Sequence, residues 1–228
     1  MAVQRLRLNY GRSGALQYLA HLDMIRLWHR LFHRAGVPLA YSEGRNPRPR
    51  ISIAAALPVG VTSGGELLDI YLKRRMSGFY FLKRIEPQLL PDLDVFGTDE
   101  VPIDSPSLQS LVRESEYLVT VDYPEPGGTL EAAVDDLLAA ETLPWEHRRE
   151  KEVRRYDLRK QVHDLWVEET SDGDATIGML LQTDPDASGR PEQVTAALGI
   201  EEPPIAIHRS KIVLAAPTQR RKRINGRS

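Results

Sequence analysis

Apolar and polar residues change their period along the first 40 positions of the chain. From Arg5 to Tyr10 every second residue is apolar, which is typical of a strand with one face in the core and one face in water. Between residues 20 and 35 the apolar positions return every three or four residues, as in an amphipathic helix. Gly36 and Pro38 then supply a glycine cap and a helix stop. The chain is therefore predicted to open with a strand and a helix.

The apolar runs that follow predict more strands and a second helix in the first half. The expected strands are 39–42, 51–57, 67–72 and 93–101, and the expected helix is 79–90. Turns are expected at Pro58-Val-Gly60 and at Ser63-Gly-Gly65. The order is β-α-β-β-α-β with the second strand elaborated as a hairpin, which is typical of a ferredoxin-like (split βαβ) arrangement.

The second half repeats this plan without residue-level identity. Strands are expected at 116–123, 175–183 and 205–214, and helices after Thr129 and Arg190-Pro191. Residues 145–169 are ambiguous, and we interpret them as strand, short helical turn and strand. We therefore predict an α+β fold of two ferredoxin-like halves in tandem. The expected units are an N-terminal domain 1–102 with an arginine-rich hairpin loop, a linker 102–112, a C-terminal domain 113–215, and a basic, disordered tail 216–228.

Composition excludes several classes of site. The 228-residue chain is 41% hydrophobic and has no cysteine, which rules out disulfides, cysteine zinc sites and cysteine-ligated iron–sulfur clusters within it. No apolar run approaches the roughly 20 residues that span a bilayer, and the N-terminus has no secretory apolar core. We expect a soluble, cytoplasmic protein without membrane contacts.

Charge is strongly segregated although the net charge is only −2. Residues 1–75 carry a net +8, 76–143 carry −11, 144–160 carry +3, 161–207 carry −9 and 208–228 carry +7. If the three basic blocks meet on one face, they form a cationic surface; alternatively, the blocks neutralise one another within the fold.

The segment Tyr41-Ser-Glu-Gly-Arg-Asn-Pro-Arg-Pro-Arg-Ile51 holds the densest group of arginines. Its two prolines exclude helix and central strand, and Gly44 allows a backbone angle that its neighbours avoid. Arginines on a stiff loop suit planar anions, above all phosphates. The alternative is a solvated hairpin loop.

The first helix adds more cations, because Arg26, Arg30 and His33 share one of its faces. That face could follow a phosphate backbone or could simply be solvated. The residues predicted to bind nucleic acid are Arg12, Arg26, Arg30, Arg45, Asn46, Arg48 and Arg50. A second basic band, 147–159, contains Tyr156, which could stack on a base, and the basic tail could add affinity that does not depend on sequence.

Few residues are candidates for catalysis or metal binding. His21 could be a general acid or base, a metal ligand or a structural residue. His29 and His33 have the spacing of two ligands on one helix face, but no Glu follows His29 and Arg30 would crowd a cation, so no metal site is predicted. The phosphate-binding glycine loop, the dinucleotide fingerprint and the Gly-x-Ser-x-Gly elbow are all absent.

Several of these segments resemble a known family. His21-Leu-Asp23, Arg34-Ala-Gly36, the arginine-rich segment, Leu57-Pro-Val-Gly60 and Leu68-Asp-Ile70 resemble the radical-SAM-linked family of unknown function, and its C-terminal signatures resemble Asp157-Leu-Arg159, Gly189-Arg-Pro191 and Arg209. Two positions depart from the family pattern. Ala20 stands where a serine often caps the helix, and Arg45 stands where an aromatic residue is usual.

The resemblance implies a partner rather than a cofactor in this chain. Family members are fused to, or encoded beside, radical S-adenosylmethionine proteins, so the partner would bring an iron–sulfur cluster and S-adenosylmethionine. We expect an accessory protein, not an enzyme on its own, that binds RNA or presents a substrate to such an enzyme. One alternative is a metal-independent endoribonuclease using His21, by a likeness in outline to CRISPR repeat-processing endoribonucleases that transfers no function. The other is a non-catalytic protein-docking scaffold.

Overall fold

The computed structural model describes residues 1–124, 129–149, 152–171, 173–184 and 187–216. Their strands are β1 (Gln4–Arg12), β2 (Ile51–Ile53), β3 (Thr62–Leu72), β4 (Leu93–Val101), β5 (Val112–Tyr123), β6 (Pro144–Arg149), β7 (Glu152–Asp157), β8 (Val162–Thr170), β9 (Gly173–Gln182) and β10 (Ala206–Leu214). The α-helices are α1 (His21–Arg34), α2 (Gly78–Ile85), α3 (Leu108–Leu111), α4 (Thr129–Ala139) and α5 (Pro191–Ala197). Three 3₁₀ turns complete the set: η1 (Gly14–Tyr18), η2 (Glu86–Gln88) and η3 (Leu158–Gln161).

The molecule is a mixed α+β protein. One eight-stranded sheet with mostly antiparallel pairing runs through it. In the first half β4, β1, β3 and β2 are neighbours in that order, all antiparallel. In the second half the order is β10, β5, β9, β8, again antiparallel throughout. Each half therefore places its fourth, first, third and second sheet strands side by side, while the β6–β7 hairpin forms a separate two-stranded sheet.

The halves join where β10 pairs in parallel with β3, through His208–Thr62 and Arg209–Ser63. This junction explains why the turn predicted at residues 63–65 is wrong. Gly64 and Gly65 lie inside β3, and a Cβ on Gly65 would be 2.2 Å from the carbonyl oxygen of Ser210. Glycine is used here for the close approach of another backbone, not for a turn.

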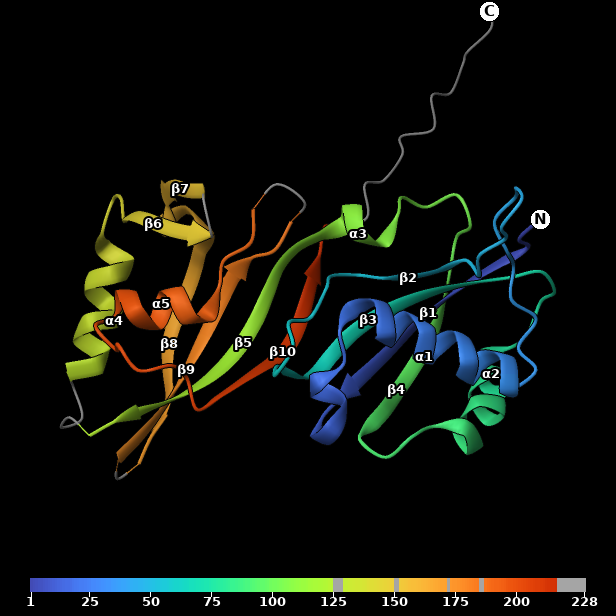
Figure 1. The fold of residues 1–228 in the computed structure, drawn as a ribbon, viewed down its shortest axis with the longest axis horizontal. Helices are drawn as coiled ribbons and strands as arrows, with labels where there is room; N and C mark the ends of the chain where they lie inside the picture. The colour runs from blue at the N-terminus through green and yellow to red at the C-terminus, as the bar shows by residue number, and fades with distance from the viewer. Residues whose placement is uncertain (125–128, 150–151, 172, 185–186, 217–228) are drawn as a thin grey trace, which may run out of the picture.

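Two hydrophobic cores lie on the helix side of the sheet, one in each half. Trp28 and Phe32 of α1 are fully buried in the first, and Leu130 of α4 and Val194 of α5 are fully buried in the second. Figure 1 shows α1 and α2 in front of the strands of the first half and α5 in front of those of the second. The predicted helix of residues 20–35 is confirmed as α1, and the helix predicted after Pro191 is confirmed as α5.

Three other sequence expectations need correction. The strand expected at 39–42 is reduced to isolated bridges from Leu39 and Tyr41, and the strand expected at 51–57 ends at Ile53. The second face of β1 is only partly in water, since Asn9 is exposed there but Arg5 is fully buried. Its guanidinium pairs with buried Asp69 and donates to the carbonyl oxygens of Ser105 and Pro106, each at 2.9 Å. The segment that joins the halves therefore covers this face.

None of the helices in the described ranges combines the length and apolar character that a bilayer crossing requires.

Candidate functional site

The arginine-rich loop is a closed hairpin. Tyr41 and Pro49 form an antiparallel bridge, the amide of Ser42 donates to the carbonyl of Arg48 at 2.8 Å, and the amide of Arg48 donates to the Ser42 hydroxyl at 3.0 Å. Gly44 has a φ of 118°, a conformation that side-chain-bearing residues rarely adopt. The local sequence therefore determines the conformation of the loop, as expected from its prolines and glycine.

The side chains of this loop are exposed and adjoin α1. Arg45, Arg48 and Arg50 are all exposed, and no carboxylate of the described residues lies within ion-pair distance of them. The Arg50 guanidinium lies 4.2 Å from the centre of the Tyr71 ring, and Tyr41 contacts His29 of α1 at 3.4 Å.

The first helix contributes two further predicted cations. Arg30 is exposed, and Arg26 is exposed but pairs with Asp23 at 2.8 Å. We call the set joined by the His29–Tyr41 contact the arginine surface. Its members are Arg26, Arg30, Arg45, Asn46, Arg48 and Arg50.

Arg12 does not belong to this surface, which corrects the sequence interpretation. It is only 2% exposed and donates to the carbonyl oxygens of Leu19 at 3.0 Å, Leu57 at 3.3 Å and Pro58 at 2.9 Å. Burial lowers the pKa of its guanidinium from the usual value. Arg12 holds two loops together from inside and is not accessible to a polyanion in this structure.

His21, the catalytic candidate of the nuclease alternative, begins α1 and is half-buried. It lines a cavity of about 10 Å³ beside Tyr10, Arg12 and Glu66. Such a volume holds about one water molecule. This cavity is too small for a nucleotide, and a catalytic role of His21 stays a prediction. No group of three or more potential metal-ligating side chains occurs in the described part of the chain.

The basic side chains that the structure describes do not all lie on one face. The β6–β7 hairpin, which carries the second basic band, lies at the opposite end of the molecule from α1 (Figure 1). Arg155 in this hairpin pairs with Glu146 at 3.0 Å. The side chains of residues 147–152 and the tail 217–228 lie outside what the structure describes. Within the described part of the chain, the basic side chains of the first helix and those of the β6–β7 hairpin are thus separated in space.

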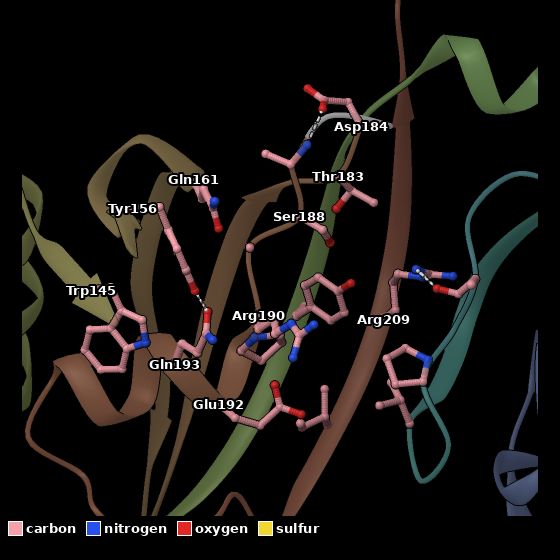
Figure 2. Close-up of a pocket in the computed structure, with 18 of the residues that line it drawn as sticks. Trp145, Tyr156, Gln161, Thr183, Asp184, Ser188, Arg190, Glu192, Gln193 and Arg209 are labelled. Atoms are coloured by element: carbon pink, nitrogen blue, oxygen red, sulfur yellow. Dashed lines mark hydrogen bonds between the residues drawn. The ribbon is translucent and has the colours of Figure 1, made fainter. Parts of the chain in front are cut away.

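A cleft of about 850 Å³ lies between the halves on the helix side of the sheet. Arg209 and Ile207 of β10 and Tyr117 of β5 line it along the sheet. The loop 56–61 forms the wall from the first half, and residues 183–184 and 187–193 with the β6–β7 hairpin form the other. Figure 2 shows Arg209 across the cleft from Tyr156 and Gln193. The volume falls within the range of about 300–1,000 Å³ that small-molecule sites occupy.

Arg209 anchors the cleft from the sheet side. Its buried guanidinium donates to Glu66 at 2.8 and 2.6 Å, and also to the carbonyl oxygens of Ala55 at 3.1 Å and Ala56 at 3.4 Å. Burial acts to lower the pKa of Arg209, but the Glu66 carboxylate and the hydroxyl of Tyr117 outweigh it, and the net pKa lies above the usual value. Arg209 therefore stays charged and fixes the loop of the first half that forms the cleft wall.

The opposite wall presents aromatic and amide groups. The Tyr156 hydroxyl donates to Oε1 of Gln193 at 2.5 Å, and the dashed line in Figure 2 marks this bond. Trp145, also labelled there, lies beside them. Oε1 of Gln161 is buried and has no hydrogen-bond partner among the described residues. One wall of the cleft is therefore lined by planar side chains that carry polar groups.

The sequence pattern did not single out this cleft. Its wall and floor nevertheless use three segments that carried the family resemblance: Pro58 from Leu57-Pro-Val-Gly60, all of Gly189-Arg-Pro191, and Arg209. Gly189 packs tightly, since a Cβ there would be 3.0 Å from the Gln161 carbonyl and from Leu181. Two signals could have located the cleft: the convergence of these three segments, and Tyr156, a candidate for stacking on a base, which lies in the cleft lining.

Several solved structures are similar to this chain, among them the two that follow. A chain of the crystal structure of a Cbf5-Nop10-Gar1 complex superposes with a TM-score of 0.50 and 10% identity, covering 91% of this chain and 48% of that chain. A chain of the archaeal box H/ACA sRNP Nop10-Cbf5 complex gives a TM-score of 0.45 and 11% identity, over 91% of this chain and 48% of that one. The chain thus spans about half the length of these structural neighbours, which it resembles in fold alone.

No curated protein matches the sequence significantly. A family model matches residues 5–191, which include the arginine surface, most of the sheet and much of the cleft. The chain therefore belongs to the family described as "Uncharacterized protein conserved in bacteria (DUF2344)".

Proposed function

We propose that this protein binds single-stranded RNA through the arginine surface and acts as an accessory to a radical S-adenosylmethionine enzyme. The observation that carries the RNA part is the closed hairpin of Tyr41–Pro49. It presents Arg45 and Arg48, and Arg50 follows it directly; all three are exposed and have no ion-pair partner among the described residues. Between residues 20 and 50 six arginines stand against Asp23 and Glu43, a local net charge of +4.

This charge suits a phosphate chain for a physical reason. Guanidinium groups bind phosphate oxygens in pairs of hydrogen bonds, and a closed loop loses little freedom when it binds. Phosphate contacts release counterions, so most of the affinity is electrostatic and falls as salt rises. The surface is local to the first half, so the contact needs only a few nucleotides.

The partner part of the proposal rests on the sequence. The chain has no cysteine and so supplies no thiolate ligand for a cluster, and its motifs resemble proteins linked to radical S-adenosylmethionine enzymes. A separate enzyme would therefore supply the cluster and the radical chemistry. Copurification of the two proteins after RNase treatment is the expected result, and loss of the enzyme after RNase would contradict direct docking.

We also infer that each half is a ferredoxin-like unit. The shared strand order of the halves and the β-α-β-β-α-β order of the first half support this inference. In the second half the β6–β7 hairpin is an insertion between α4 and β8.

A filter-binding titration against short single-stranded RNA over a salt series tests the RNA proposal. The logarithm of affinity should fall linearly with the logarithm of salt concentration. The triple variant R45A/R48A/R50A should bind more weakly and reduce the slope by about 2, at about 0.7 per phosphate contact.

The matched control is R113A/R155A/K160A, which removes three exposed cations from the second half. It should retain the slope and affinity of the natural chain. Equal behaviour of the two triple variants, or no salt-sensitive binding at all, would overturn the role of the arginine surface.

A further inference from the structure

We propose that the cleft between the halves binds one nucleotide unit, with the base inside and the phosphate at the rim near Arg154. This inference deepens the RNA proposal and depends on it only for the source of the nucleotide, an RNA strand or a free mononucleotide.

Charge along the cleft favours an uncharged group in its interior. Three arginines line it, Arg154, Arg190 and Arg209, and three carboxylates oppose them, Glu146, Asp184 and Glu192. Arg209 is moreover neutralised by Glu66 at 2.6 Å. Counted with Glu66, the described lining of the cleft therefore has one more carboxylate than guanidinium groups and does not concentrate a run of phosphates, in contrast to the arginine surface. A neutral, polar, planar group therefore fits the interior best.

Flat side chains and two oriented amides supply the recognition chemistry. Trp145 and Tyr156 are aromatic residues of the kind on which bases stack. Because Oε1 of Gln193 accepts the Tyr156 hydroxyl at 2.5 Å, its amide nitrogen is left to donate. Oε1 of Gln161 is a buried acceptor without a partner among the described residues. A donor and an acceptor in one flat-walled cleft complement a nucleobase edge, which carries both.

The unpartnered Gln161 oxygen is the strongest single indication of a ligand. Buried polar atoms are almost always hydrogen-bonded, and exceptions point to a missing water, ion or ligand. The atom lies in the same lining as Gly189, Arg190 and Gln193. A donor from an exocyclic amine or a ring N–H would satisfy it.

Titration calorimetry with AMP, GMP, CMP, UMP and a five-nucleotide RNA at fixed salt tests the inference. At least one nucleotide should bind saturably with one site per chain. W145A should weaken this binding about tenfold through lost stacking. Y156F should weaken it because the Gln193 amide loses its orientation.

The matched control is Y123F, which also removes a hydroxyl that makes a hydrogen bond, at 2.8 Å to Thr129, but lies away from the cleft. It should leave the affinity unchanged within about twofold. If W145A lowers the melting temperature, Q161L is a second test, because it replaces the whole amide group, including the unpartnered acceptor, with an apolar group of similar size.

The outcomes separate the two proposals. R45A/R48A/R50A should keep mononucleotide binding while losing the salt-sensitive affinity for RNA. If the five-nucleotide RNA binds, the mononucleotides do not, and Y156F weakens the binding, the ligand of the cleft is a nucleotide within an RNA strand. If only the mononucleotides bind, the ligand is a free nucleotide. The cleft inference is overturned if no probe binds saturably at millimolar concentration, or if W145A, Y156F and Q161L leave the binding unchanged. Neither result bears on the proposal for the arginine surface.

Discussion

The residue with the most connections between the halves is Arg209. It pairs with Glu66 across the junction, its backbone oxygen accepts from the Ser63 hydroxyl at 2.7 Å, and its guanidinium holds the loop at Ala55. A charged side chain in the interior is tolerated because every part of this arrangement is paired. One sequence position thus organises the strand junction and the cleft wall together.

Replacing Arg209 with methionine should therefore strongly destabilise the folded protein. R209M keeps the volume but leaves the Glu66 carboxylate buried without its partner, which should cost about 3–5 kcal/mol of unfolding free energy. Urea denaturation followed by fluorescence measures this change. R75A, which breaks an exposed pair with Glu100, should cost about 1 kcal/mol or less. A loss below about 1 kcal/mol for R209M would contradict a structural role for the buried pair.

At the scale of elements, strand β3 is longer than its apolar run indicates. The predicted strand begins at residue 67, but the observed one begins at Thr62 and passes through two glycines. Local chemistry favours a turn at Ser-Gly-Gly, and only the neighbouring β10 backbone makes an extended strand the better conformation there. The arginine loop is the opposite case, because prolines and a glycine determine its shape locally.

A methyl group at Gly65 should disrupt the junction of β3 and β10. G65A places a Cβ 2.2 Å from the Ser210 oxygen, and backbone atoms cannot yield cheaply, so we expect a loss of about 1–3 kcal/mol or more. G97A in β4 is the matched control, since a Cβ on Gly97 would meet no atom within 4 Å. Thermal denaturation should show a clear fall for G65A and little change for G97A; equal melting temperatures would show that β10 moves aside freely.

At the scale of the molecule, one sheet unites two cores. The strand β10 follows the second half in sequence and pairs with β5 over most of its length, yet it also pairs with β3. The arginine surface lies in the first half, whereas the cleft takes residues from both. Disruption of the junction should consequently affect the cleft before the arginine surface.

The two halves should unfold in one transition. Trp28 reports on the first core, and Trp166 follows the second half from β8. W145F/W166F keeps only Trp28 and W28F/W145F keeps only Trp166. Within each variant, the urea midpoint from tryptophan fluorescence should coincide with the midpoint from far-UV circular dichroism, which follows both halves, as expected for a single cooperative unit. Separate midpoints from the two signals of one variant would show that the junction couples the halves only weakly.

The sequence by itself determined the locally encoded features of this protein. Hydrophobic period placed β1 and α1, and proline and glycine chemistry placed α5 and the arginine loop, because these signals act between residues close in the chain. Tertiary structure alone decided that Arg12 and Arg5 are interior groups, that the described basic side chains of α1 and of the β6–β7 hairpin lie apart, and that a cleft lies between the halves. Burial and cavities arise from contacts between residues as distant as Glu66 and Arg209, and no local pattern records which distant segment will cover a side chain.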